Sequence, residues 1–415
     1  MNYSMDKLGS HIDILSGFAF KSSDFIETGI PVIKIKNVTP PSVTLEDLSF
    51  VSEEVAEQQS KFLLEPDDVL IALTGSHINQ MASVVGRVAR VKYNVPSLLN
   101  QRVGKITILN PAEANIDYIY YFLSQDSVKI ELASKAGGAA NQANISPTDI
   151  KNLIIPFPDI AVQNKIASIL LAYDNLIENN QKQIKLLEEA AKRLYKEWFI
   201  DLRFPGHEST PIHNGIPEGW EKKAFSAVFS YVRGRSYSSK ELSDDGILMA
   251  NLKNIRAFGG YNRGAEKRYI GEYKDCQLLS AGDIIMGVTD MTQERRLVGH
   301  VAVVPDVKEP MVFSMDLIKL LPITCPKSYL YSALQFGGLS DRISPLANGV
   351  NVLHLKPEAM MNLKMVVPDE TTMLKFDEAF SAFQSRIEIL QNQSTAAEEA
   401  RDRLLPKLMS GEIEV

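Results

Sequence analysis

Cysteine is scarce in this chain of 415 residues, which has two, Cys276 and Cys325. Both lie in the second half, so a disulfide framework cannot support both halves, and we expect two buried free thiols. No apolar run is long enough to span a bilayer, and the first ten residues lack the cationic and apolar regions of a signal peptide. These absences predict a cytoplasmic protein that does not contact a membrane.

Catalytic and cofactor motifs are also missing. The sequence has no phosphate-binding loop and no dinucleotide-binding glycine fingerprint. Its six histidines are scattered without metal-ligand spacing. We therefore expect no catalytic residues, no metal site and no cofactor. The formal net charge of -7 further excludes a protein that coats nucleic acid nonspecifically.

What the sequence does contain is an internal repeat. Five segments of the first half recur in the same order in the second half, and the offset drifts only from 217 (254 minus 37) to 210 (357 minus 147). The paired segments are 17–23 with 234–240, 36–37 with 253–254, 68–74 with 283–289, 86–91 with 299–304 and 147–153 with 357–363. The halves are therefore predicted to be structural duplicates.

Each half has a β-rich stretch followed by a long helical pattern. Alternating or continuous apolar residues predict strands at 29–38, 69–73 and 105–109, with a short helix at 118–124. The second half repeats this order with strands at 246–255, 284–288 and 317–321 and a helix at 329–334. This arrangement predicts an α+β fold with two duplicated, β-rich globular domains.

Two helical segments carry apolar residues at alternating steps of four and three, the spacing of a coiled coil. Asn180 lies within the first seam, where a polar residue fixes register, whereas Ser394 and Arg401 interrupt the second seam. The seam residues are Ile166, Leu170, Tyr173, Ile177, Ile184, Leu187, Leu194 and Trp198 in the first helix and Phe376, Phe380, Phe383, Ile387, Leu390 and Leu404 in the second. The interruptions make the end of the second helix the less certain part of this pattern.

These patterns divide the chain into globe, helix, linker, globe and helix. The predicted boundaries are 1–157 for the first domain, 158–202 for the first helix, 203–219 for the linker, 220–367 for the second domain and 368–410 for the second helix. We expect the two helices to pack antiparallel and to separate the domains with pseudo-twofold symmetry. The alternative is that each helix docks onto its own domain as a core helix.

Polar and cationic residues recur beside the predicted strands, where loops carry function. Arginine, asparagine and glutamine can bond base edges in pairs, and serine, threonine and lysine can hold phosphates. The candidates are Lys21, Ser22, Lys34, Lys36, Asn37, Thr74, Ser76, Asn100, Gln101, Arg102, Asn141 and Gln142 in the first half, and Arg233, Arg235, Tyr237, Asn251, Lys253, Asn254, Arg256, Thr292, Gln293, Arg295 and Arg296 in the second. The same residue types are common in ordinary solvated loops, which is the alternative interpretation.

Several segments together resemble the specificity (S) subunits of type I restriction-modification systems. They are GFAFK at 17–21, GIPVIK at 29–34, PFPD at 156–159, LYKEWF at 194–199, GIPEGW at 215–220 and RLLPKLMSGEI at 403–413. The resemblance covers nearly the whole chain. It implies two target recognition domains that each read one half of a split DNA sequence, with the antiparallel helices as a ruler between them.

The resemblance also implies the partners of the chain. Such a subunit binds double-stranded DNA, docks two adenine methyltransferase (M) subunits and reaches restriction (R) subunits through them, without being catalytic itself. Arg102 and either Arg235 or Arg295 are then predicted to read guanine, and Lys21, Lys36 and Lys253 to hold phosphates. Two alternatives remain at this point: a recognition subunit for a fused methyltransferase-nuclease, and a coiled-coil assembly adaptor that does not bind DNA.

Overall fold

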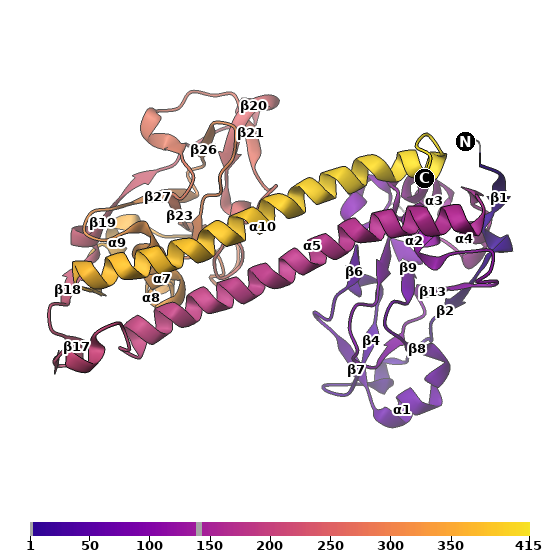
Figure 1. Ribbon diagram of the computed structural model, residues 1–415, viewed down its shortest axis with the longest axis horizontal. Coiled ribbons are helices and arrows are strands. Elements are labelled where there is room, and N and C mark those ends of the chain that lie inside the picture. The colour runs from indigo at the N-terminus through magenta and orange to yellow at the C-terminus, as the bar shows by residue number, and fades with distance from the viewer. Residues whose placement is uncertain (1–2, 138–142) are drawn as a thin grey trace. The chain divides into compact units, whose positions relative to one another are not determined.

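The computed structural model describes residues 3–137 and 143–415. The chain divides into two units (Figure 1). Unit 1 consists of Met1–Glu178 and Ser394–Val415, and unit 2 consists of Asn179–Gln393. Both long helices therefore contribute one end to each unit. Among the described residues, no helix is both long enough and apolar enough to cross a membrane.

Unit 1 contains two main sheets and two short ribbons. The larger sheet has the order β2 (Ile12–Ser16), β13 (Val103–Ile108), β9 (Val69–Ala72), β11 (Val88–Arg90), β6 (Ser42–Val43) and β5 (Val38–Thr39). The second has the order β3 (Phe25–Ile26), β7 (Ser49–Val51), β4 (Ile30–Ile33), β12 (Ser97–Leu99) and β8 (Leu63–Leu64). The ribbons pair β1 (Met5–Lys7) with β15 (Ile154–Pro156) and β10 (Thr74–Gly75) with β14 (Ala143–Asn144).

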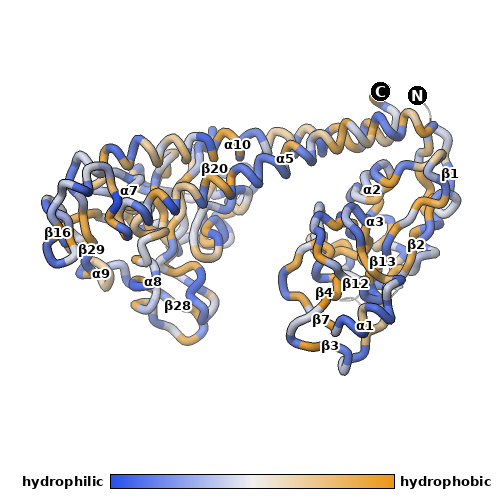
Figure 2. The backbone as a smooth tube through the Cα atoms, turned by 60° about the horizontal axis from the view of Figure 1, so that its bottom comes forward, coloured by the Kyte–Doolittle hydropathy of each residue, from blue (hydrophilic) through white to orange (hydrophobic). Residues whose placement is uncertain are grey.

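The larger sheet of unit 1 is buried on both faces, which explains its continuous apolar strands. In β9, Val69 and Ile71 join the core beneath the helices, and Leu70 and Ala72 join a second core against the other sheet. The covering helices are α2 (Ile116–Ser124), α3 (Asp126–Lys135) and α4 (Pro147–Lys151), and the short α1 (Glu53–Gln58) packs on the outer sheet. Figure 2 shows hydrophobic segments among the strands of this unit.

Unit 2 has the same layers. Its inner sheet has the order β19 (Phe229–Arg233), β27 (Leu317–Pro322), β23 (Ile284–Gly287) and β25 (Val301–Val303), and its outer sheet β21 (Lys267–Tyr269), β20 (Leu242–Ala250), β26 (Met311–Phe313) and β22 (Leu278–Leu279). The ribbons pair β18 (Glu221–Ala224) with β29 (Lys364–Val367), β24 (Thr289–Asp290) with β28 (Leu353–His354) and β16 (Ile212–His213) with β17 (Ile216–Pro217). Its short helices are α6 (Phe225–Val228), α7 (Lys327–Phe336), α8 (Leu339–Ile343) and α9 (Pro357–Met360).

Equivalent hydrogen bonds in the two units confirm the duplication. Gly17 N donates to Val103 O, and Gly234 N donates to Leu317 O. Tyr118 Oη donates to Pro156 O at 2.6 Å in unit 1, and Tyr329 Oη donates to Val366 O at 2.7 Å in unit 2. These pairs differ by 217, 214, 211 and 210 residues, so they follow the offset of the sequence repeat.

The two long helices are α5 (Ile160–Tyr195), extended by a π-helical turn at Lys196–Ile200, and α10 (Glu370–Ser410). Within unit 1 they run antiparallel, because Ile166 shares a core with Leu408 whereas Asp174 pairs with Arg401. The core of unit 1 thus includes one end of each helix. The alternative prediction, that each helix docks onto its own domain as a core helix, is therefore partly right, since the helix ends complete the domain cores.

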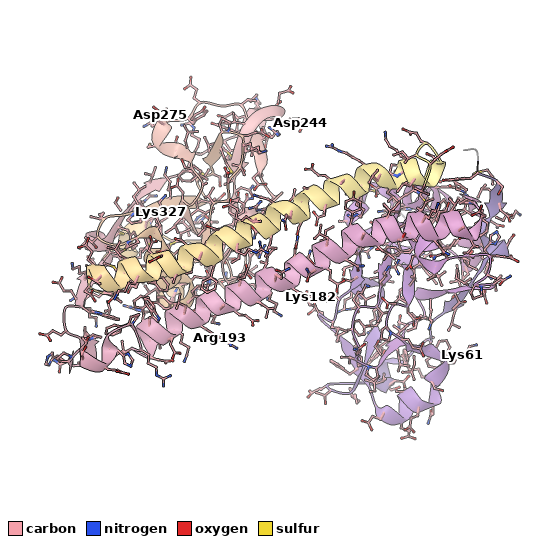
Figure 3. The ribbon with its side chains drawn as sticks, viewed as in Figure 1. Lys61, Lys182, Arg193, Asp244, Asp275 and Lys327 are labelled. Carbon is pink, nitrogen blue, oxygen red and sulfur yellow. The ribbon has the colours of Figure 1, made fainter. Side chains whose placement is uncertain are left out.

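In unit 2 the helices are also antiparallel. Asn180 Nδ2 donates to Leu390 O at 3.4 Å, and the rings of Tyr195 and Phe376 lie 6.2 Å apart. All of the predicted seam residues are buried or half-buried, and Asn180 is only 2% exposed. Charged side chains such as Arg193 point away from this seam into solvent (Figure 3).

The predicted interruption of the second seam does not end the helix. Helix α10 continues to Ser410, Ser394 is buried, and Arg401 is held by the carboxylate of Asp174 at 2.6 Å. A partly buried arginine can occupy an apolar seam when a carboxylate neutralises it. The sequence pattern of one helix could not identify this partner, because it lies 227 positions away.

Predictions for two strands and for both cysteines are wrong in detail. The strands predicted at 29–38 and 246–255 end at Ile33 and Ala250, and a 3-10 turn follows each of them. Cys276 is exposed rather than buried. Cys325 is half-buried, and burial raises the pKa of its thiol to about 12, so this thiol is protonated at neutral pH.

Candidate nucleic-acid interface

The loops that carry the candidate residues meet at one edge of each unit. We call residues 17–21, 34–37, 73–77 and 100–102 edge 1. Phe18 N donates to Leu99 O, and Gln101 N donates back to Phe18 O. The other two loops join them because Asn100 N donates to Ile33 O and Leu73 N to Arg102 O. The strand ends of unit 1 thus bring together residues far apart in the sequence.

Unit 2 has the same framework. We call residues 234–237, 250–254, 288–293 and 314–316 edge 2. Here Arg235 N donates to Phe313 O and Met315 N to Arg235 O. Ser314 N donates to Ala250 O, and Val288 N to Asp316 O. Each bond has its counterpart in edge 1, so the two edges hold equivalent loops in equivalent places.

A glycine is required where each edge is most tightly packed. A Cβ atom on Gly17 would lie 2.4 Å from Asn100 O, and one on Gly234 would lie 2.0 Å from Ser314 O. Neither contact is possible for a real side chain, since the obstacle is backbone. The repeated glycine of the sequence therefore marks the place where two loops of each edge pass in contact.

Edge 1 presents polar side chains to solvent. Lys21, Lys36, Gln101 and Arg102 are exposed, as is Ser22 directly after Lys21, and Asn100 is half-buried. Within 3–137 and 143–415, no ion pair is formed by Lys36 or Arg102. A guanidinium, an amide and two ammonium groups on one edge can contact base edges and phosphates.

Three predicted amides hold the loops instead of facing outward. Asn37 Oδ1 accepts from Lys34 N at 3.1 Å, and its Nδ2 donates to Glu46 O at 2.8 Å. Asn254 repeats this with Asn251 N and Asn262 O at 2.9 and 3.0 Å. Asn251 donates to Ala265 O and accepts from Lys253 N. All three side chains are 5% exposed or less, so we assign them to loop structure rather than base contact.

Three more candidates of unit 1 are engaged within the protein. Lys34 Nζ donates to Ser49 Oγ at 2.8 Å and lies 3.9 Å from the Phe25 ring centroid. Burial, followed by repulsion from Lys36, lowers the pKa of Lys34. Thr74 is buried and donates to Asn144 Oδ1, and Ser76 donates to Gln80 O. The predicted candidates Asn141 and Gln142 lie outside the described residues.

Three of the six cationic candidates of unit 2 have acidic partners. Arg233 lies 2.7 Å from Glu358, and Arg296 pairs with Glu294. Arg256 lies 3.9 Å from Glu188 of α5, so it faces the helix rather than edge 2. Lys253 is exposed on edge 2. The sequence analysis missed these glutamates, because they are distant in sequence or carry no motif.

Arg235 and Tyr237 are supported by a tyrosine and a lysine that the sequence analysis did not select. Arg235 Nε donates to Tyr269 Oη at 3.4 Å, and this bond is the main cause of its raised pKa. Lys267 Nζ donates to Tyr237 Oη and lies 4.9 Å from its ring centroid. Both side chains are half-buried at edge 2, which restrains their orientation.

Asp290 organises the loop that carries three further candidates. Burial alone would raise its pKa, but hydrogen bonds from Leu297 N, Thr292 and Val298 N outweigh burial and lower it. Gln293 Nε2 donates to Val350 O at 2.7 Å, and Arg295 adopts a positive φ of 52°. A charged, fully buried carboxylate thus holds this exposed loop in one shape.

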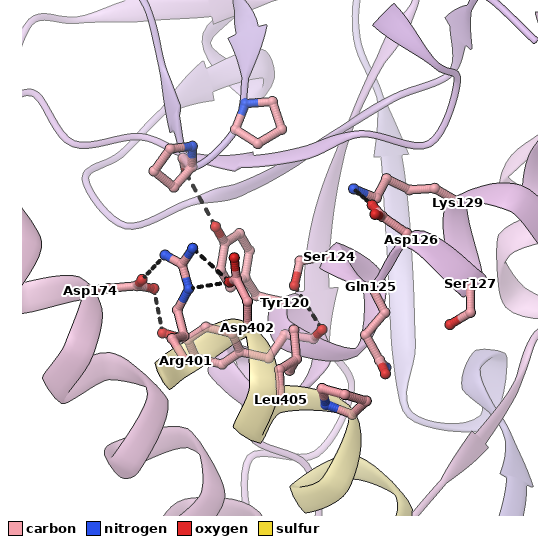
Figure 4. Close-up of a pocket in the computed structure, with 14 residues that line it drawn as sticks. Tyr120, Ser124, Gln125, Asp126, Ser127, Lys129, Asp174, Arg401, Asp402 and Leu405 are labelled. Atoms are coloured by element: carbon pink, nitrogen blue, oxygen red, sulfur yellow. Dashed lines mark hydrogen bonds and ion pairs between the residues drawn. The ribbon is translucent and has the colours of Figure 1, made fainter. Parts of the chain in front are cut away.

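A groove of 530 Å³ in unit 1 is lined by α2, by the turn between β5 and β6 and by both long helices. Its floor is an ion-pair cluster (Figure 4). Asp174 accepts from Tyr121 Oη and from Arg401 Nη1, both at 2.6 Å, and Arg401 also contacts Asp402. Arg401 thus bridges two carboxylates, and the cluster is suited to structure rather than to proton transfer.

No group of three or more histidine, cysteine, aspartate or glutamate side chains in residues 3–137 and 143–415 is arranged to hold a metal ion. The predicted absence of a metal site concerns the whole chain and stays a prediction. The chemistry that the two edges offer is recognition by hydrogen bonds, charge and apolar contact.

Comparison with known proteins adds family information to this geometry. The profile of the Type I restriction modification DNA specificity domain matches residues 2–189. The MjaIX specificity subunit of a type I restriction enzyme from Methanocaldococcus jannaschii is 27% identical over 311 residues, covering 72% of this chain and 69% of the relative. The MjaVIII specificity subunit from the same organism is 22% identical over 307 residues, covering 72% and 70%.

The fold has a counterpart among solved structures. The S subunit of a type I restriction-modification system from M. genitalium superposes with a TM-score of 0.61 at 17% sequence identity. The match covers 99% of this chain and 96% of that chain. It extends the likeness in fold beyond the residues that the family profile matches.

Proposed function

Because this chain is similar to the specificity subunits of type I restriction-modification systems, we propose that it belongs with them and reads a bipartite DNA sequence. Unit 1 contacts one half-site through edge 1, and unit 2 contacts the other half-site through edge 2. The chain acts with two methyltransferase subunits and, through them, with restriction subunits. It contributes recognition, and the chemistry belongs to those partners.

The observation that carries this proposal is that edge 1 and edge 2 share the same backbone hydrogen bonds but present different side chains. Equivalent backbone bonds place Phe18 beside Gln101 on edge 1 and Arg235 beside Met315 on edge 2. An amide suits adenine and a guanidinium suits guanine in the major groove. Two rigid, equivalent edges with unlike side chains are what two readers of different half-sites require.

Exposed lysines support the phosphate contacts. Lys21 and Lys36 on edge 1 and Lys253 on edge 2 are exposed beside the proposed base readers. Each phosphate contact releases condensed counterions, so binding should weaken as salt rises. Local cations thus offset the overall charge of -7.

The proposal is tested with Arg102→Ala and Arg235→Ala in the complex with methyltransferase subunits. Each variant should lower discrimination at one half-site by about 1 to 3 kcal/mol, and the two variants should affect different half-sites. Binding to duplexes mutated one base pair at a time measures this. Arg193→Ala is the control, since Arg193 is exposed on α5 outside both edges. Equal loss on every duplex would contradict base reading.

A further inference from the structure

Large apolar side chains gather on edge 2 and the loop joined to it. Met291 is 75% exposed, Met315 is 52% exposed and Val350 is 88% exposed. Isolated exposed apolar residues are ordinary on protein surfaces, but three on connected loops call for an explanation.

Hydrogen bonds fix these loops to one another. Gln293 Nε2 donates to Val350 O at 2.7 Å, which ties the loop after Met291 to the loop of Val350. Met315 N donates to Arg235 O, and Val288 N donates to Asp316 O. The apolar side chains are therefore presented by a preorganised edge, which lowers the entropic cost of using them in binding.

Edge 1 is polar at the equivalent places. The acceptors Leu99 O and Phe313 O belong to equivalent hydrogen bonds and are 214 positions apart in the sequence. With the same offset, Gln101 of edge 1 corresponds to Met315 of edge 2. The hydrogen-bond acceptors Ala72 O and Gly287 O are likewise equivalent and are 215 positions apart. With that offset, Ser76 corresponds to Met291. At these two matched positions the apolar side chain is therefore on edge 2 alone, although Ile78, which directly follows edge 1, is 52% exposed.

We infer that Met291 and Met315 contact the 5-methyl groups of thymines in the half-site that unit 2 reads. This inference rests on the proposed function and adds the chemical feature of the base that edge 2 recognises. The thymine methyl is the apolar group that base pairs present in the major groove. Arg235, bonded to Met315 through the backbone, places a cation beside this surface, which favours nucleic acid as the occupant.

Uracil tests the inference because it pairs like thymine but lacks the 5-methyl group. Duplexes carry deoxyuridine in place of thymine in one half-site at a time, and their affinity for the complete complex with methyltransferase subunits is measured. We expect substitution in the half-site of unit 2 to weaken binding about three- to fivefold per contacted methyl. Substitution in the half-site of unit 1 should weaken it less.

The matched variants Met291→Ser and Met315→Gln give edge 2 the side chains of edge 1. They should remove the preference for thymine over uracil while the complex remains folded and assembled. Unchanged affinity on the uracil duplexes, with sequence-specific binding intact, would overturn the inference and leave the proposed function standing. Loss of methyltransferase binding in these variants would instead identify a protein-docking surface. Absence of any sequence-specific binding would overturn the proposed function itself.

Discussion

At the scale of the residue, the most informative side chains are the buried amides that the sequence analysis had placed on DNA. The sequence analysis correctly placed these asparagines in loops. The direction in which each side chain points, however, depends on carbonyl groups elsewhere in the chain. Asn37 finds Glu46 O nine positions away, and Asn254 finds Asn262 O eight positions away. A single sequence does not show which asparagine has such a partner and which faces solvent.

This assignment predicts that two substitutions change the free energy of unfolding by different amounts. Asn254→Ala leaves Asn251 N and Asn262 O without their partner, so it should destabilise the protein by about 1 to 3 kcal/mol. Arg102→Ala removes an exposed side chain and should change the free energy of unfolding by less than about 0.5 kcal/mol. Urea unfolding measures both. A stable Asn254→Ala variant with weakened DNA binding would contradict this assignment and indicate that the amide contacts DNA.

At the scale of the element, the sequence predicted the two helices well because their apolar spacing persists for many turns. Strand positions such as 69–73 and 284–288 were also predictable, since β9 and β23 are buried on both faces. The strand ends were not, because alternation continues past Ile33 while the Asn37 side chain turns the backbone. Local hydrogen bonds decide those boundaries.

The helix pair contains one interaction that the repeat does not preserve. With the offset of 210, Asp174 corresponds to Gln384 (174 plus 210) and Arg401 to Ala191 (401 minus 210). Only unit 1 therefore has the Asp174–Arg401 pair, whose side chains are each 21% exposed. Two helices of similar pattern gain a distinct register from such a pair.

A double-mutant cycle measures the energy of this pair. Asp174→Gln and Arg401→Ala should each destabilise the protein by about 1 to 3 kcal/mol, because each leaves a partly buried charge without its partner. The double variant has the residues of unit 2 and should be less destabilised than the sum by about 1 kcal/mol or more. Additive changes in urea unfolding would show that the pair makes no net contribution.

At the scale of the whole molecule, the repeat is the feature on which the proposed function rests. It was visible in the sequence, and paired hydrogen bonds confirm it in each unit. Which side chains each edge exposes was only partly predictable. The candidate residues included the exposed Arg102 and Gln101 and the half-buried Arg235, but they omitted the exposed Met291 and Met315, since apolar loop residues carry no recognised DNA-binding pattern.

The most direct measurement is the mapping of methyladenine in DNA from cells that express this chain with its methyltransferase subunits, compared with cells that lack the chain. We expect a motif of two specified parts separated by an unread gap of fixed length. Arg102→Ala should relax one part and Arg235→Ala the other. A contiguous motif, or methylation that does not depend on the chain although the complex assembles, would contradict bipartite recognition by the two edges.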